Sequence, residues 1–158
     1  MKIDYVYVNP GGNPTALVIS KVSRKQQAGI AKKIMGQIPI CEQVGFIERA
    51  KSPRALFRLQ MMGGEFCGNA TRALAAWLAK QKKSRKIFKA VIESSGTSRL
   101  VRIWANFEEQ NRKSWAETQV PLSKNLKVVR GKIKVDDALI PAIRVNLSGI
   151  THFLINKR

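Results

Sequence analysis

The sequence contains few of the residues on which several protein classes depend. Its 158 residues include only two cysteines, Cys41 and Cys67, and a single histidine, His152. Two cysteines are too few for a disulfide scaffold, and their spacing fits no zinc motif. No apolar run approaches the ~18 residues of a membrane span, and the N-terminus lacks the apolar stretch of a secretory signal. We therefore expect reduced thiols, a cytoplasmic location, no bound metal and no membrane partner.

Acidic residues are also scarce, with 10 Asp and Glu against 29 Lys and Arg, and the formal net charge is +19. This charge raises the hypothesis of a basic nucleic-acid-binding domain, because clustered cations release counterions from phosphates. The densest cluster, between Lys80 and Lys89, follows an expected helix end, where cations also suit the helix dipole. The sequence shows no recognisable pattern of aromatic residues interleaved with cations that would stack bases. A solvated basic surface is the favoured interpretation, although nothing in the sequence explains the size of the charge.

Hydrophobic patterning predicts many short strands and two helices. The first helix begins after Ser23, which forms a capping box with Gln26, and ends at Gly36. The second runs over about 69–80 and carries a strongly apolar stripe at helical spacing. The expected strands are 3–8, 15–20, 44–47, 56–61, 87–92, 100–105, 115–120, 126–135, 142–147 and 152–155, with a polar hairpin tip at 108–113.

No alternating strand–helix–strand pattern, repeat or low-complexity segment is recognisable. The economical arrangement is an α/β (α+β) domain in which a curved, mostly antiparallel sheet wraps around the second helix. We expect residues 1–158 to form one such domain. The apolar strand just before the last residues is more typical of a domain boundary than of a finished protein.

The segment 63–72 combines a strand end, a glycine turn and a cysteine at the start of the second helix. The N–H groups at a helix start carry partial positive charge, which lowers the pKa of a thiol placed there. Those of Asn69 and its successors could also hold a substrate carboxylate. Cys67 is thus a candidate base for removing a proton next to that carboxylate. The alternative is a small buried hydrophobe, the usual role of an unpaired cysteine, and the residues alone leave both open.

Three motifs then indicate a family. Residues 65–72, Glu-Phe-Cys-Gly-Asn-Ala-Thr-Arg, resemble the signature around the first catalytic cysteine of the diaminopimelate epimerase superfamily. Residues 12–15, Gly-Asn-Pro-Thr, and 41–48, Cys-Glu-Gln-Val-Gly-Phe-Ile-Glu, are most similar to the histidine racemases of staphylopine-type metallophore biosynthesis within it. The order and spacing of the motifs also match, so the resemblance covers essentially the whole chain.

The resemblance implies an isomerase made of two pseudo-symmetric halves, each a curved sheet around a helix and each supplying one cysteine. One thiolate would take the α-proton of an amino acid, and the other thiol would deliver a proton to the opposite face, without pyridoxal phosphate, metal or any other cofactor. Carried over by position, Cys67 would be the catalytic acid/base. The implied substrate-binding residues are Asn13, Gln43, Gly68, Asn69 and His152.

Each of these roles has a plainer alternative. Asn13 could serve only its Pro-Gly turn, and Gln43 could cap a loop. His152 could be a strand residue packed against the other half.

The chain departs from the diaminopimelate epimerase pattern in three places. Gly149-Ile150-Thr151-His152 replaces a Gly-Asn-Pro-His turn, and Met61 or Met62 replaces an asparagine that contacts substrate. Both changes favour a different amino acid, and histidine is our first choice. The third departure is that no second cysteine motif follows. Cys41 is no substitute, because a buried structural role is expected for it.

The expected partners are therefore an amino-acid substrate and a missing C-terminal half. That half could be the rest of a longer protein, a separate subunit, or a second copy of the chain in a homodimer. The alternative functions are a non-catalytic ligand-binding domain of the same fold and the basic nucleic-acid-binding domain.

Overall fold

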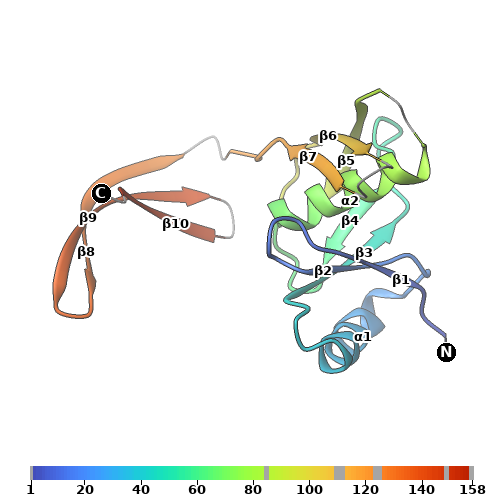
Figure 1. Ribbon diagram of the computed structural model, residues 1–158, viewed down its shortest axis with the longest axis horizontal. Helices are drawn as coiled ribbons and strands as arrows, with labels where there is room; N and C mark the ends of the chain where they lie inside the picture. The colour runs from blue at the N-terminus through green and yellow to red at the C-terminus, as the bar shows by residue number, and fades with distance from the viewer. Residues whose placement is uncertain (1, 84–85, 109–112, 123–125, 148–149, 157–158) are drawn as a thin grey trace. The chain divides into compact units, whose positions relative to one another are not determined.

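The computed structural model describes residues 2–83, 86–108, 113–122, 126–147 and 150–156 (Figure 1). The chain divides into two compact units, Met1–Val120 and Pro121–Arg158. The family motifs at residues 12–15, 41–48 and 65–72 all lie in the first unit.

The first unit contains a seven-stranded sheet in which the strands lie side by side in sequence order. They are β1 (Tyr5–Val8), β2 (Thr15–Val18), β3 (Gln43–Glu48), β4 (Arg58–Met61), β5 (Phe88–Ser94), β6 (Val101–Glu108) and β7 (Lys113–Thr118). Four neighbouring pairs are antiparallel, so the expectation of a mostly antiparallel sheet is confirmed. The pairs β2–β3 and β4–β5 are parallel. Parallel neighbours need a crossover connection, and each helix supplies one. The strand and helix patterns of the sequence did not indicate these parallel pairs.

The two helices lie where the sequence predicts them, with small differences at their ends. Helix α1 spans Arg24–Gln37, one residue beyond the expected end at Gly36. Ser23 is its N-cap, but its hydroxyl donates to Gln26 Oε1 at 2.7 Å and makes no cap bond to the backbone. The predicted capping box is therefore incomplete. Helix α2 spans Gly68–Gln81, one residue longer at each end than predicted, and Cys67 is its N-cap.

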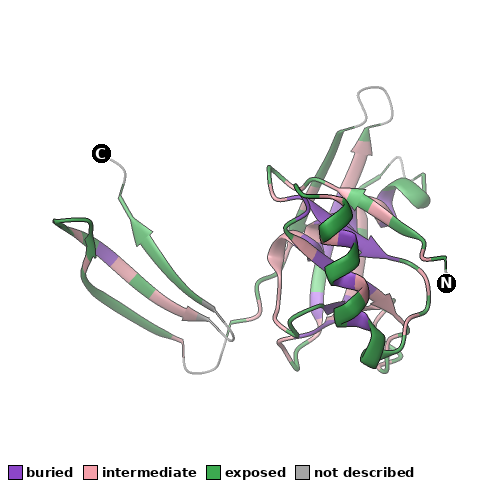
Figure 2. Ribbon diagram, turned by 90° about the horizontal axis from the view of Figure 1, so that it is seen from below, coloured by how far each residue is buried: buried purple, intermediate pink, exposed green. Residues whose placement is uncertain are grey.

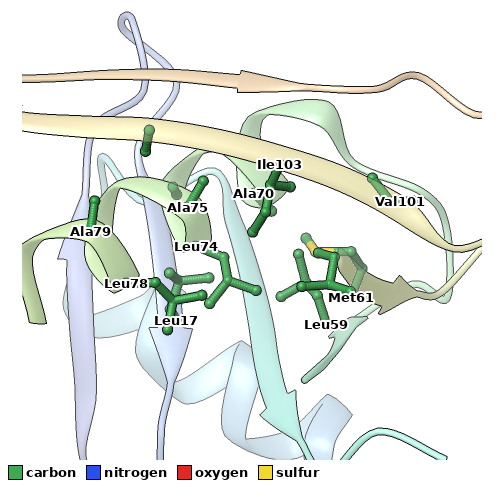
Figure 3. Packing of buried hydrophobic residues seen from close by; sticks show 13 residues of the cluster. Leu17, Leu59, Met61, Ala70, Leu74, Ala75, Leu78, Ala79, Val101 and Ile103 are labelled. Atoms are coloured by element: carbon green, nitrogen blue, oxygen red, sulfur yellow. The ribbon is translucent and has the colours of Figure 1, made fainter. Parts of the chain in front are cut away.

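The sheet curves around α2, which contacts β2, β3, β5, β6 and β7. Figure 3 shows the α2 side chains packed among those of β2, β4 and β6. Helix α1 packs on the opposite face, because alternate residues of a strand point to opposite sides. Leu17 of β2 belongs to the α2 cluster, whereas Ala16 and Val18 belong to the α1 cluster. The predicted sheet around a central helix is thus confirmed.

Gly45 in β3 allows close packing on the α2 side of the sheet. A Cβ at this position would lie 2.9 Å from Leu59 Cδ1 and 3.3 Å from Met61 Sδ, both in fully buried side chains. We expect Gly45→Ala to lower the free energy of unfolding by about 1–3 kcal/mol, as overpacked cores do. The control is Gly29→Ala on exposed α1, where nothing lies within 4 Å of the added Cβ. That change should raise stability by about 0.5–1 kcal/mol. Denaturant unfolding measures both, and equal effects would contradict the packing argument.

The second unit is a three-stranded antiparallel sheet of β8 (Lys127–Val135), β9 (Ala138–Leu147) and β10 (Ile150–Ile155), in the order β10–β9–β8. All three strands were predicted, although β9 begins four residues before the expected Ala142. Its strands are largely exposed, in contrast to the buried strands and helix of the first unit (Figure 2). That residues 1–158 form a single domain stays a prediction, and most of the expected hairpin tip lies outside the described residues. Across the described part of the chain, no helix is long and apolar enough to cross a membrane.

Candidate active site

Cys67 lies where the chain turns from strand β4 into helix α2. Gly64 makes the turn with a φ of +80°, a conformation that L side chains rarely adopt. Cys67 itself is extended, and its Sγ accepts a hydrogen bond from the backbone N–H of Ala70 at 3.4 Å. The Thr71 hydroxyl donates to the carbonyl oxygens of Cys67 at 3.1 Å and Gly68 at 2.8 Å. The half-buried thiol is therefore held at the start of a buried helix.

The turn between β5 and β6 contacts the segment that carries Cys67. The Ser95 hydroxyl donates to the carbonyl oxygen of Glu65 at 2.6 Å and accepts from the Met61 N–H at 2.9 Å. Gly96 has a φ of +70°, and a Cβ on it would lie 2.1 Å from the backbone nitrogen of Phe66. Only glycine permits this approach. The sequence predicts the turn, but not its contact with the cysteine segment.

Two of the predicted substrate-binding residues lie together with Cys67. The Cys67 thiol donates to Gln43 Oε1 at 2.6 Å. The Gln43 amide nitrogen donates to Asn13 Oδ1, and the Asn13 amide nitrogen donates to the Glu42 carboxylate. The parallel register of β2 and β3 brings these residues together, because Thr15 lies opposite Gln43. Glu42 was not among the predicted site residues, although it stands in the motif at 41–48.

Gly68 and Asn69 lie directly beside the thiol, at the start of α2. The Asn69 backbone N–H points toward the sulfur, and its side-chain oxygen accepts from the Arg72 guanidinium. Arg72 also donates to the carbonyl oxygen of Pro10 at 3.4 Å, which ties the glycine turn at residues 9–13 to the helix. Nothing lies within 4 Å of the position of a Gly68 Cβ. There is therefore open space on the side of Gly68 where a side chain would lie.

Burial raises the pKa of the Cys67 thiol above its ordinary value. The backbone N–H groups of Ala70 and Asn69 act in the opposite direction. Of the nearby charges, the Glu65 carboxylate raises the pKa and the Arg72 guanidinium lowers it. The predicted lowering of the pKa by the helix start was therefore wrong in its net direction, because desolvation is the larger effect.

We therefore expect Cys67 of this chain to remain a thiol at neutral pH. Its folded-state pKa lies above the value of an unfolded thiol, about 8.5. The protonated thiol thus stabilises the fold fully below pH ~8.5, and this contribution is lost as pH rises through the folded-state pKa. The rate of Cys67 alkylation by iodoacetamide, followed by peptide mass spectrometry, should have a higher pH midpoint in the folded chain than in denaturant. A lower midpoint in the folded chain would contradict the pKa direction.

The remaining predicted positions are less central. Cys41 is 5% exposed within the α1 cluster, and its Sγ donates to the Gln43 carbonyl at 3.4 Å, consistent with a structural role. Met61 is fully buried, whereas Met62 is 36% exposed. His152 is exposed on β10 of the second unit, opposite Val145. Its contact with a substrate stays a prediction.

The structure also contains a groove of about 730 Å³ along α2, between β1 and β7. Arg72, Trp77, Lys80 and Phe107 are among its lining residues, and Cys67 lies outside this lining. Within the described ranges, no group of three or more His, Cys, Asp or Glu residues could hold a metal ion.

Comparison with known proteins assigns the chain to a family. The family model described as the histidine racemase CntK N-terminal domain matches residues 2–158. The chain belongs to this family. Over 157 residues it is 34% identical to a histidine racemase of Fusobacterium nucleatum, and the match covers 98% of the chain and 54% of that protein. A histidine racemase of Staphylococcus aureus is 46% identical over 71 residues, 44% of the chain and 26% of that protein. The chain spans about half the length of the Fusobacterium relatives.

Solved structures give the same fold. A hydroxyproline epimerase from Agrobacterium vitis, with bound trans-4-hydroxy-L-proline, matches 98% of the chain and 51% of its own with a TM-score of 0.66 at 13% identity. A probable proline racemase from Agrobacterium radiobacter covers 98% of the chain and 52% of its own, with a TM-score of 0.59 at 14% identity. At such identities the likeness concerns the fold alone. It confirms the epimerase-like architecture predicted from the sequence.

Proposed function

We propose that the chain is the N-terminal half of a cofactor-independent histidine racemase, with Cys67 as one of its two acid/base thiols. Membership of the histidine racemase family supports the activity and the substrate. The observation that carries the role of Cys67 is its position at the N-cap of α2, with its sulfur against Gln43 Oε1 and the Ala70 N–H. The second thiol would come from a C-terminal half, consistent with the length of the Fusobacterium relatives.

In this proposal a thiolate on one face takes the α-proton, and a thiol on the other face delivers a proton to the same carbon. The pKa of Cys67 is raised by burial, which suits the thiol that delivers the proton. After delivery the sulfur is a thiolate, facing the N–H groups of Ala70 and Asn69. In the reverse direction this thiolate takes the proton, so the two cysteines exchange roles. A reducing, cytoplasmic location would keep both sulfurs available.

The start of α2 is the proposed site for the substrate carboxylate. A carboxylate near Gly68 and Asn69 would meet the positive end of the helix dipole and its N–H groups. The same groups would stabilise the negative charge that develops on the carboxylate side when the α-proton leaves. Asn13, which precedes β2, and Gln43, the first residue of β3, would contact the substrate. The substrate-binding role of His152 is proposed from the family resemblance alone. The reaction would use neither pyridoxal phosphate nor a metal.

The substrate is tested by α-proton exchange in the natural protein. Proton NMR in deuterated buffer under reducing conditions would follow the α-hydrogen signals of L-histidine, meso-diaminopimelate and trans-4-hydroxy-L-proline in parallel. We expect the fastest loss with histidine. Faster exchange of another amino acid would contradict the substrate. Thermal stabilisation by histidine with no exchange of any amino acid would instead favour a non-catalytic ligand-binding domain.

A further inference from the structure

The hydrogen bonds that end at Cys67 form an unbranched sequence of four side chains. It runs from the exposed Glu42 carboxylate to the Asn13 amide, from there to the Gln43 amide, and from Gln43 to the sulfur. Asn13 precedes β2, Glu42 directly precedes β3 and Gln43 is its first residue, and Cys67 caps α2. Because three separate segments are joined in this way, a change at Glu42 can reach the sulfur without direct contact.

The carboxylate sets the direction of every hydrogen bond in this sequence. An ionised carboxylate only accepts hydrogen bonds, so the Asn13 side chain must turn its NH₂ group toward Glu42. The Asn13 side-chain oxygen then faces Gln43, whose NH₂ group donates to it. The Gln43 oxygen is left facing Cys67, where only a protonated sulfur can donate to it. A thiolate in the same place would face the negative end of a carbonyl dipole.

We infer that Glu42 and Asn13 are positioning residues which, through Gln43, hold Cys67 in the thiol form between turnovers. The hydrogen bonds are observed in the structure, whereas their importance for catalysis rests on the proposed function. Other groups also act on the sulfur. The Glu65 carboxylate favours the thiol, whereas Arg72 and the N–H groups of Ala70 and Asn69 favour the thiolate. The hydrogen bonds from Glu42 through Asn13 and Gln43 to Cys67, called the relay below, add a further preference for the thiol. This preference depends on the orientation of the Asn13 and Gln43 side-chain amides.

The relay would set the resting state of the proposed reaction. Cys67 would begin each cycle protonated, its S–H bond would break as the new C–H bond forms at the α-carbon, and the electron pair would stay on sulfur. The opposite thiolate would accept the departing α-proton, so protons balance. Once product leaves, the Gln43 oxygen would favour return of a proton to Cys67. Glu42 and Asn13 would thereby make the two cysteines unequal before substrate binds.

The pH midpoint of Cys67 alkylation in the 158-residue chain tests the relay without any substrate. We expect Glu42→Ala and Asn13→Ala each to lower this midpoint by about one pH unit, because Gln43 can then turn its NH₂ group toward the sulfur. The double variant should show the same midpoint as either single variant, because both changes break one sequence of bonds. Peptide mass spectrometry separates Cys67 from Cys41, and thermal unfolding confirms that the variants are folded.

Asn13→Ala also distinguishes the relay from a simple effect of charge, because it leaves the Glu42 carboxylate in place. A lower midpoint with Glu42→Ala and an unchanged one with Asn13→Ala would overturn the inference, as would additive effects in the double variant. Glu65→Gln is the matched control, since Glu65 acts on Cys67 through space and lies outside the relay. Its downward effect should add to that of every relay variant. Loss of racemase activity would not affect this test, so the two proposals can fail separately.

Discussion

Replacement of Cys67 by serine is expected to lower the rate of histidine racemisation in the natural protein by at least about a hundredfold. A serine hydroxyl ionises at far higher pH than a thiol. At neutral pH it therefore forms almost no anion that could take the α-proton, and it is a much weaker acid for delivering one. Serine is, however, a favourable helix N-cap, and Cys67 already occupies that position with its sulfur bonded to Ala70. The variant should therefore stay folded. Chiral chromatography of the product would measure the rate.

The control for this prediction is Cys41→Ala. Cys41 is buried in the α1 cluster on the other face of the sheet from α2, and its sulfur donates to the backbone carbonyl of Gln43. Its loss should cost some stability and leave the rate per folded molecule within a few-fold of the original. If the serine variant at Cys67 kept more than about a tenth of the activity, Cys67 would not be a catalytic acid/base.

Gly96→Ala is expected to lower the free energy of unfolding by about 3 kcal/mol. The added Cβ would lie 2.1 Å from the Phe66 nitrogen and 2.5 Å from the carbonyl carbon of Glu65, where real Cβ atoms do not occur. Both neighbours are backbone atoms, so no side-chain rotation can relieve the contact. The segment that carries Cys67 would have to move, and activity should fall with stability. Denaturant unfolding measures the change.

Gly11→Ala is the matched control for this prediction. Gly11 has a φ of +69°, close to the +70° of Gly96, but nothing lies within 4 Å of its Cβ position. Its replacement should cost only the backbone penalty, about 1 kcal/mol. Similar losses for the two variants would mean that backbone conformation, and not the approach to Phe66, makes Gly96 necessary.

The fold was largely predictable because its signals are local. The apolar stripe over 69–80 and the alternating strands follow from helical and strand periodicity, and the structure differs from them by one or a few residues. The parallel pairs β2–β3 and β4–β5 were missed. Strand patterns state which residues face the core, but they do not state which strand lies beside which, or in what direction.

The sequence motifs could name residues that lie together in the structure, but the roles of these residues in binding and catalysis stay predictions. The motifs placed Asn13, Gln43 and Cys67 in one site, and the hydrogen bonds join them. The direction of the Cys67 pKa depends on burial by distant segments, which periodicity does not give. The approach of Gly96 to Phe66 is likewise a contact between distant segments. Glu42 in the motif at 41–48 was the available signal for the relay, since a carboxylate that accepts from the Asn13 amide fixes the orientation of that amide and, through it, of Gln43.

The most direct test of two thiols acting from opposite faces is the position of solvent deuterium early in the reaction. The natural protein would be given L-histidine in deuterated buffer, and both enantiomers would be analysed by mass spectrometry before a tenth of the substrate is converted. We expect deuterium in newly formed D-histidine and almost none in the remaining L-histidine, because different sulfurs take and deliver the proton. Deuterium appearing equally fast in both enantiomers would mean that a single base serves both faces, and would contradict the role proposed for Cys67.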